Sequence, residues 1–288
     1  MNAVIRTARP KQWLKNVLVF AAPGAAGVLN EPDALGKTLL GFVALCLAAS
    51  GIYFWNDVLD VESDREHPTK CNRPIAAGQL GIGPALVIGS VLPLLALGLA
   101  ALTGEWKAVA AVAAYIVVTL TYSAIWKHIA VIDLIAISSG FVLRAITGAA
   151  VTAVPVSSWF ILVTTFGSLF IVTGKRFAES RELGADAGKL RATLEAYSEG
   201  YLRFVLAVTV GGALLSYCMW AFETKELSGT DLPYYELSIV PIIAAFLRYA
   251  LVLENGHGAA PEDVFASDRV LQVLGLVWVV IFALAVYT

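Results

Sequence analysis

Long apolar stretches separated by short polar segments run along the whole chain. A membrane-spanning helix needs about 20 apolar residues, and nine stretches approach or reach that length: roughly 12–29, 35–56, 83–103, 106–124, 129–150, 157–174, 202–222, 235–253 and 270–287. Several are rich in Gly and Ala, which allows close helix packing in lipid. The pattern predicts an all-α polytopic membrane protein with nine transmembrane helices and a single domain over residues 1–288.

Composition supports this class. Hydrophobic residues make up 58% of the chain and the mean hydropathy is +0.76, well above the values of soluble proteins. The N-terminus is basic but lacks the short apolar segment and cleavage site of a signal peptide. The three cysteines and three histidines show no metal-ligand spacing. We expect the lipid bilayer as a partner and no nucleic acid, and we leave assembly with further copies of the chain open.

The positive charges are distributed unevenly over the predicted loops. With nine spans, sixteen Lys and Arg fall on the side of the N-terminus, against three on the other side, which are Lys37, Lys107 and Lys225. Arg144 lies inside a span. Cytoplasmic loops carry the excess of Lys and Arg. The sequence therefore predicts a multi-pass protein of the cell membrane, with a cytoplasmic N-terminus, an external C-terminus and long cytoplasmic loops that cap an active site.

An acidic string follows the second apolar stretch directly. Residues 56–64 read Asn-Asp-Val-Leu-Asp-Val-Glu-Ser-Asp. On a helix, Asp57, Asp60 and Asp64 share one face, and Asn56 lies at its edge. Three carboxylates on one face repel unless a cation lies between them, and oxygen ligands without His or Cys suit a hard ion such as Mg²⁺. We interpret the four residues as metal ligands; the alternative is a solvated acidic helix end.

Basic residues follow the string within ten positions, namely Arg65, Lys70 and Arg73. A metal that neutralises some oxygens and cations that bind the others suit a metal–diphosphate complex. Contact of Lys70 and Arg73 with lipid headgroups is the alternative. A second polar cluster lies between the fourth and fifth spans and contains Tyr122, Lys127 and Asp133. Carboxylates at a membrane boundary are usually functional, although Asp133 could also be a buried partner of a neighbouring cation.

The string from Asn56 to Asp64, followed by Lys70-Cys71-Asn72-Arg73-Pro74 and Gly78, resembles the first signature of the UbiA superfamily of membrane-embedded transferases. The resemblance covers nearly the whole chain. It implies nine transmembrane helices around a central cavity, cytoplasmic capping loops and a Mg²⁺-bound diphosphate donor. Most members transfer a prenyl group and carry an Asp-x-x-x-Asp pair in the second signature. This chain departs from that pattern, because Ile137 stands four residues after Asp133.

The form Tyr-Ser-x-x-x-Lys-x-x-x-x-x-Asp at 122–133 resembles one branch of the superfamily. That branch transfers 5-phosphoribose from phosphoribosyl pyrophosphate to decaprenyl phosphate in the arabinan precursor pathway of the cell wall. The segments 9–16 and 174–179 resemble its opening and sixth-loop signatures. The resemblance adds these residues to the predicted substrate-binding set: Lys11, Gln12, Lys15, Asn16, Asn56, Arg65, Lys70, Arg73, Tyr122, Lys127, Asp133, Lys175 and Arg176.

The number of cations also favours this branch, because its two substrates bring three anionic groups to one site. Positive-inside topology predicts basic loops as well, so this argument is weaker than the resemblance. Asp57, Asp60, Asp64, Lys127 and Asp133 are the predicted catalytic residues. Two other functions remain open. One is transfer of a prenyl group from a prenyl diphosphate to an aromatic or other small acceptor, and the other is a transporter or channel.

The predicted orientation can be tested with single cysteines at Gly81 and Gly188 in a chain that lacks its native cysteines. Both positions lie in loops predicted to be cytoplasmic. They should resist a membrane-impermeant thiol reagent in intact cells and react after lysis. Labelling of both from outside would reverse the orientation.

Overall fold

The computed structural model describes residues 3–183, 192–228, 232–256, 258 and 260–288, and every regular element in this part of the chain is a helix. Eight helical segments are long and apolar enough to cross a membrane. They are α3 (Pro32–Leu59), α5 (Ile82–Ala101), α6 (Trp106–Ala124), α7 (Ile132–Val151), α8 (Ser158–Leu183), α11 (Glu199–Ser228), α12 (Tyr234–Leu237) joined to α13 (Ile239–Glu254), and α15 (Arg269–Tyr287). The predicted all-α, multi-pass architecture is confirmed.

The first predicted span, 12–29, differs from the other eight. Three short elements cover it. They are the 3-10 helix η1 (Pro10–Phe20), the α-helix α2 (Ala21–Ala25) and the 3-10 helix η2 (Val28–Asn30). Gly27, with a φ of 72°, separates α2 from η2, because a left-handed residue cannot continue a right-handed helix. The apolar stretch is present as predicted, but it does not form one continuous α-helix.

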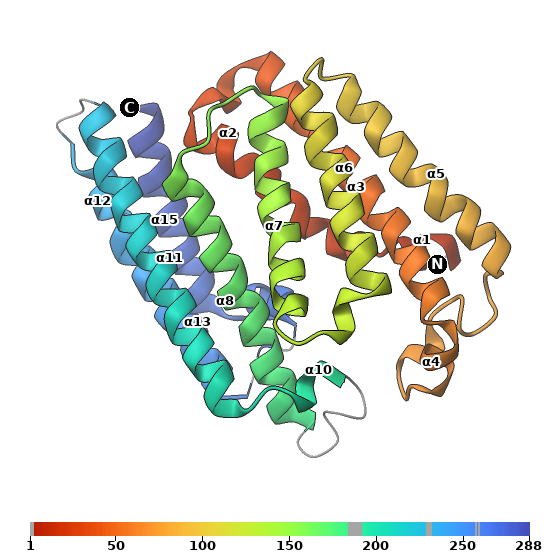
Figure 1. Ribbon diagram of the computed structural model, residues 1–288. Coiled ribbons are helices and arrows are strands. Elements are labelled where there is room, and N and C mark those ends of the chain that lie inside the picture. Colours follow the sequence, from red (N-terminus) through yellow and green to blue (C-terminus); the bar gives the residue numbers. More distant parts are fainter. Residues whose placement is uncertain (1–2, 184–191, 229–231, 257, 259) are drawn as a thin grey trace. The chain divides into compact units, whose positions relative to one another are not determined.

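The chain folds as two compact units, residues 1–156 and residues 157–288. The single domain over 1–288 stays a prediction. In the first unit, α3 is the central helix and packs against α5, α6, α7, η1 and α1 (Ala3–Ala8). Figure 1 shows α5, α6 and α7 beside it. The core at this centre consists of small and branched side chains and one tyrosine: Val19, Ala44, Leu45, Ala48, Ala49, Ile52, Ala96, Ala100, Val112 and Tyr115.

The polar connections of the first unit gather at one end of its helices. The short helix α4 (Val61–Glu66) follows α3 there, and η4 (Trp126–His128) joins α6 to α7. Figure 1 shows α4 and the α6–α7 connection at the same end of this unit. The loop from α4 to α5 contains η3 (Lys70–Asn72). Both acidic and basic clusters of the sequence therefore lie at one end of the helix bundle.

The second unit is built on two long helices, α8 and α11, which pack along each other. The helix α13 packs on α15, and α12 contacts both α11 and α15. Polar contacts join α15 and α11 to the junction of α12 and α13, because Trp278 Nε1 donates to Tyr217 Oη at 2.7 Å and this hydroxyl lies 2.7 Å from Ser238 Oγ. The remaining described helices are short, α10 (Ala192–Glu195) and α14 (Pro261–Ser267).

The segment that follows α14 stabilises the start of α15. Asp268 precedes that helix and accepts the backbone N–H of Leu271 at 2.9 Å, as helix N-caps do. Arg248 of α13 donates to the same carboxylate at 2.8 Å. The hydrogen bond from Arg248 holds the pKa of Asp268 below its usual value. The contact therefore ties α13 to the beginning of α15.

Large apolar side chains also cover the outside of both units. Leu94 is 67% exposed, and Leu215 and Leu276 are each 65% exposed. Each lies in a helix long enough to span a membrane. Lipid tails would cover such a surface in a bilayer.

The 3-10 helix η1 approaches α7 closely at Gly148. A Cβ atom at this position would lie 1.8 Å from the backbone oxygen of Val19, so only glycine allows the contact. We expect Gly148→Ala to lower the free energy of unfolding by about 1–3 kcal/mol through overpacking. Gly98→Ala in α5 is the matched control, because its Cβ would meet nothing within 4 Å. Thermal unfolding in detergent measures both, and equal midpoints would contradict the close approach.

Candidate active site

Two carboxylates of the acidic string are buried and share one partner. Asp57 lies in the last turn of α3 and Asp64 in α4, and each side chain is 2% exposed. Arg73, which follows η3, donates from the same Nη1 atom to Asp57 Oδ1 at 3.1 Å and to Asp64 Oδ2 at 2.7 Å. The predicted proximity of Asp57 and Asp64 is confirmed.

Asp57 has a second cationic partner that the sequence did not place in the site. Arg9 Nη2 donates to Asp57 Oδ1 at 2.5 Å, across 48 positions of the chain. The Arg9 guanidinium also lies over the Tyr53 ring, 4.9 Å from its centroid. Arg9 precedes Pro10 in the segment 9–16, which resembles a family signature. This resemblance was the sequence signal that could have placed Arg9 in the site. Its position at Asp57 depends on how η1 packs against α3.

Asp60 lies apart from the other two carboxylates. The helix α3 ends at Leu59, and Asp60 (φ −96°, ψ 7°) separates it from α4. Its carboxylate accepts a short hydrogen bond from Lys127 Nζ of η4. This ion pair connects the acidic string to the second cluster, 67 positions later. The assumption of one unbroken helix from Asp57 to Asp64 is wrong, because Asp60 lies between α3 and α4, although the Asp64 N–H still donates to the Asp60 carbonyl at 2.8 Å.

The predicted metal ligands are not all placed equally well to hold a divalent ion. Asp57 and Asp64 contact one nitrogen atom of Arg73 and therefore lie near each other, and carboxylate oxygens are of the kind that Mg²⁺ binds. Asp60 is directed to Lys127 instead. Among the described residues, no three His, Cys, Asp or Glu side chains are placed to hold a metal together. Asn56 is half-buried beside this pair.

Asp133 and Tyr122 lie on either side of η4. Asp133 is fully buried in the first turn of α7, whereas Tyr122 is half-buried near the end of α6. The Asp133 backbone N–H donates to the Ile129 carbonyl at 3.0 Å. Because Lys127 lies between these helices and bonds to Asp60, the α6–α7 connection is anchored to the acidic string.

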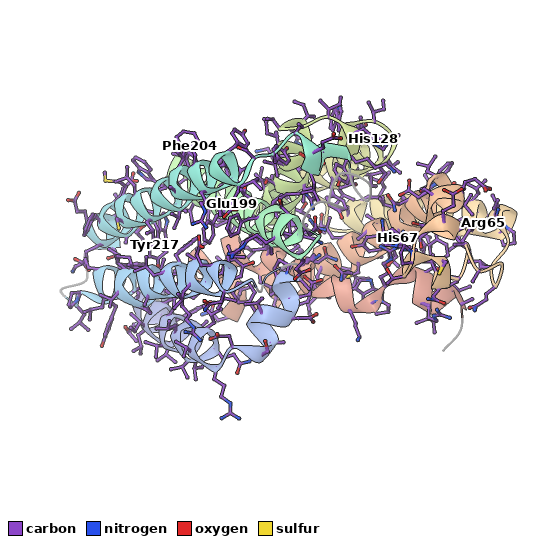
Figure 2. All side chains as sticks on the ribbon, turned by 90° about the horizontal axis from the view of Figure 1, so that it is seen from below. Arg65, His67, His128, Glu199, Phe204 and Tyr217 are labelled. Carbon is purple, nitrogen blue, oxygen red and sulfur yellow. The ribbon has the colours of Figure 1, made fainter. Side chains whose placement is uncertain are left out.

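The loop after α4 is held by its own polar contacts. The Nδ1 atom of His67 accepts the backbone N–H of Thr69 at 3.2 Å, and Lys70, half-buried, begins η3. Burial and the nearby Lys70 lower the pKa of His67. Arg65 is exposed and donates to Glu62 at 2.9 Å. Figure 2 shows Arg65 and His67 on this part of the first unit. Arg65 therefore does not contact the buried carboxylates.

The predicted residues of η1 have different environments. Lys11 is exposed, and Gln12 and Lys15 are half-buried. Asn16 is fully buried, accepts Arg144 Nε at 2.8 Å and donates to Cys46 Sγ at 3.2 Å. Its side-chain amide thus contacts other side chains of the core. Its role as a substrate-binding residue stays a prediction, and the structure adds a buried contact with Arg144 that the sequence pattern around Lys15 did not reveal.

Arg144 occupies a buried position inside the predicted span α7. It also donates to Tyr115 Oη and to the Gly140 carbonyl, each at 2.9 Å. The guanidinium lies 4.8 Å from the centroid of the Tyr115 ring. Neutral acceptors and an aromatic face thus stabilise this charge and attach η1 to α6 and α7.

Lys175 and Arg176 belong to the second unit, on α8. Arg176 is 1% exposed and donates to Glu179 Oε2 at 2.6 Å, and Lys175 Nζ lies 3.8 Å from Glu179 Oε1. Nearby, Arg203 of α11 donates to Glu254 at 2.7 Å. Figure 2 shows Glu199, another partner of Arg203, near the start of α11. Lys189 and Arg191, also counted in the charge distribution, lie outside the described residues.

Comparison with known proteins agrees with the resemblance seen in the motifs. The UbiA prenyltransferase family matches residues 17–271. The chain is 45% identical to a decaprenyl-phosphate phosphoribosyltransferase of Corynebacterium glutamicum, over 99% of this chain and 87% of that protein. It is 42% identical to the enzyme of that name from Mycobacterium tuberculosis, over 98% and 94%.

Solved structures show the same fold. A UbiA homologue from Archaeoglobus fulgidus, bound to GPP and Mg²⁺, superposes with a TM-score of 0.74 at 17% identity, over 99% of both chains. A structure of that homologue with DMAPP and Mg²⁺ gives a TM-score of 0.75 at 16% identity, over 98% of both. The chain belongs to the UbiA prenyltransferase family.

The contacts of Asn16 predict a structural effect. Asn16→Ala removes the acceptor of a buried guanidinium and should lower the free energy of unfolding by about 1–3 kcal/mol. Cys46→Ala removes only a weak sulfur acceptor and should have a smaller effect. The measurement is thermal unfolding in detergent, with the KM of the donor measured beside it. An unchanged unfolding midpoint together with a raised KM would contradict the structural role and favour substrate binding by Asn16.

Proposed function

We propose that this UbiA-family protein transfers 5-phosphoribose from phosphoribosyl pyrophosphate to a polyprenyl phosphate and releases pyrophosphate. The observation that carries the proposal is the similarity, along nearly the full length, to decaprenyl-phosphate phosphoribosyltransferases. The single carboxylate of the second cluster, Asp133, supports it independently. Decaprenyl phosphate as the natural acceptor, a role in the arabinan pathway of the cell wall, and a cytoplasmic active site are finer parts of this proposal.

The donor would bind at the carboxylates that Arg73 joins. Asp57 and Asp64, with Asn56 beside them, would hold Mg²⁺, which when bound neutralises charge on the departing pyrophosphate. Arg73 and Lys127 provide donors for phosphate oxygens at the same end of the first unit. We assign Lys70, Lys11 and Lys15 to the wider ring of cations that attracts the phosphate groups.

The chemistry requires positioning more than proton transfer. As the bond between C1 of the ribose and the pyrophosphate oxygen breaks, C1 gains oxocarbenium character and an oxygen of the acceptor phosphate forms the new bond. That phosphate is already an anion near neutral pH, so the site needs no strong general base. We assign Asp133 to the ribose hydroxyls, because its position beside η4 is within the second cluster. Alignment of the two anions then supplies most of the rate enhancement.

The acceptor is an amphiphile whose phosphate must reach the polar end of the bundle. Apolar helices with exposed Leu and Val side chains, such as α5, offer a lipid-like surface for its chain. Lys175 and Arg176 on α8 stay predicted substrate-binding residues. Both side chains pair with Glu179 within the second unit, and for the buried Arg176 this pair is also a structural contact. An assembly with further copies of the chain also stays a prediction.

The alternative is prenyl transfer from a prenyl diphosphate to an aromatic or other small acceptor. The family description and the prenyl diphosphates bound by the Archaeoglobus fulgidus homologue keep it in view. At 17% identity, that likeness establishes the fold alone. The transporter or channel interpretation receives no support from these relatives.

A two-substrate assay separates the remaining functions. Purified protein should transfer label from phosphoribosyl pyrophosphate to polyprenyl phosphate, and should not join a prenyl diphosphate to 4-hydroxybenzoate. EDTA should abolish turnover and Mg²⁺ should restore it. Asp57→Asn keeps an acceptor for Arg9 and Arg73 but loses the charge, and should lower kcat at least about a hundredfold if it binds the ion. Glu62→Gln, an exposed carboxylate of α4, is the matched control.

Three results of this assay would contradict the proposal. Prenyl transfer without phosphoribosyl transfer would favour the alternative function. Full activity in EDTA would remove the metal from the mechanism. Equal activity of Asp57→Asn and Glu62→Gln would remove Asp57 from the site.

A further inference from the structure

The chain turns sharply at residues 73–79, between η3 and α5, and we call this segment the Arg73 turn. Its backbone closes on itself. The Ala77 N–H donates to the Arg73 carbonyl at 2.8 Å, and the Gln79 N–H donates to the Pro74 carbonyl at 2.8 Å. These hydrogen bonds fix the shape of the turn, but they join it to no other element. Its attachment to the helices therefore depends on side chains.

One attachment is apolar and involves the N-terminal helix α1. Ile75, within the Arg73 turn, is 2% exposed and belongs to a core cluster with residues of α3, α4 and α5. Val4 and Ala8 of α1 pack against the same cluster. They stand four positions apart and so lie on one face of that helix. Figure 1 shows α1 beside α3. The apolar face of α1 therefore covers the core into which the turn inserts Ile75.

The other attachment is polar and comes from Arg6, which stands between those two apolar positions on α1. Its Nη2 atom donates to the Asn72 carbonyl at 2.9 Å, and its Nη1 atom donates to Gln79 Oε1 at 2.9 Å. Asn72 directly precedes Arg73, and Gln79 is the last residue of the turn. A guanidinium is planar and holds its donors in a fixed arrangement. One rigid group thus ties both ends of the Arg73 turn to α1.

The contact at Asn72 bears directly on Arg73. The Asn72 carbonyl and the Arg73 nitrogen belong to one planar peptide unit, so a hydrogen bond to that carbonyl fixes the direction in which the Arg73 backbone leaves η3. Arg73 Nη1 then reaches Asp57 Oδ1 at 3.1 Å and Asp64 Oδ2 at 2.7 Å. A shift of about 1 Å in a binding group can cost about a hundredfold in rate. Anchoring of this backbone is therefore a functional requirement of the site.

We propose that Arg6 is a positioning residue of the diphosphate site, which holds the Arg73 turn so that Arg73 stays within reach of a diphosphate bound at Asp57 and Asp64. The proposal rests on the proposed function in requiring that Arg73 binds the diphosphate of the donor. Arg6 acts through Arg73 and does not contact the substrate. Because Arg6 is exposed, its loss affects the turn more than the stability of the whole fold.

The test measures binding and backbone opening in purified full-length protein in detergent. Electron paramagnetic resonance of Mn²⁺ gives the affinity for Mn²⁺–pyrophosphate, and amide hydrogen exchange over residues 72–80 reports opening of the turn. Arg6→Gln should weaken Mn²⁺–pyrophosphate binding about fivefold, part of the roughly tenfold effect of a whole charge-assisted contact. Exchange in the turn should become faster, whereas the thermal unfolding midpoint should stay unchanged.

Two further variants separate positioning from charge. Arg6→Lys keeps the positive charge but loses the planar pair of donors, and it should bind as weakly as Arg6→Gln. Gln79→Leu changes no charge and removes one of the two acceptors, so it should weaken binding by about twofold to threefold. Arg203→Gln is the matched control, because this exposed arginine donates to Glu199 and Glu254 in the second unit. It should keep the wild-type affinity.

A double-mutant cycle tests the route through Arg73. Arg73→Gln should weaken Mn²⁺–pyrophosphate binding at least about tenfold. Arg6→Gln added to this variant should change the affinity by less than about twofold, because the group that Arg6 positions is then absent. The two residues should therefore be strongly non-additive.

Wild-type affinity in Arg6→Gln would overturn the proposal. Wild-type affinity in Arg6→Lys would also overturn it, because Arg6 would then supply charge alone. An undiminished effect of Arg6→Gln in the Arg73→Gln background would place Arg6 on the diphosphate itself. If Arg73→Gln does not fold, Arg6→Lys and the exchange of the turn decide.

The same measurements distinguish this proposal from the proposed function. Unchanged binding in Arg73→Gln would remove Arg73 from the diphosphate site and would overturn the positioning role with it. Neither ribose nor lipid is present in the binding experiment. A failed two-substrate assay with the expected coupling of Arg6 to Arg73 would therefore count against the proposed function alone.

Discussion

The burial of charge at one end of the first unit determines how its polar connections fold. Asp57 and Asp64 are each 2% exposed, and an unpaired buried carboxylate would cost several kcal/mol. Arg73, which follows these carboxylates in the chain, and Arg9, which precedes them, supply the partners that avoid this cost. Two segments are consequently held against the end of α3. One is the loop after α4, and the other is the N-terminal arm, which consists of Arg9 and η1 (Pro10–Phe20). Lys127 does the same for the α6–α7 connection through Asp60.

A second buried cation fixes the other end of the N-terminal arm. Arg144 donates to Asn16, Tyr115 and the Gly140 carbonyl, all neutral acceptors. The close approach of η1 to α7 at Gly148 places Asn16 within reach of that guanidinium. The arm is thus held at Asn16 by α7 and at Arg9 by α3. This double attachment explains how a segment without a continuous α-helix can present a side chain to Asp57 in a defined position.

The scaffold and the chemistry are separable in this family. At 17% identity the Archaeoglobus fulgidus homologue keeps the same fold, because a bundle of apolar helices tolerates many substitutions that preserve volume and polarity. We propose that the small set of polar residues at the end of the first unit selects the transferred group. Asp133 stands there as a single carboxylate, next to a lysine that already pairs with Asp60.

The sequence by itself determined the helix class, eight of the spans and the proximity of Asp57 to Asp64, because helical periodicity and apolar length are local properties. It also identified the family through residues that follow one another closely, from Asn56 to Arg73. The tertiary structure decided the rest. Asp60 pairs with Lys127 across 67 positions, and Asn16 is buried against Arg144 across 128 positions. Arg9 donates to Asp57 across 48 positions, and Ser50 of α3 donates to the neighbouring Ala8 carbonyl. Such long-range pairings depend on how helices pack, and no local pattern encodes them.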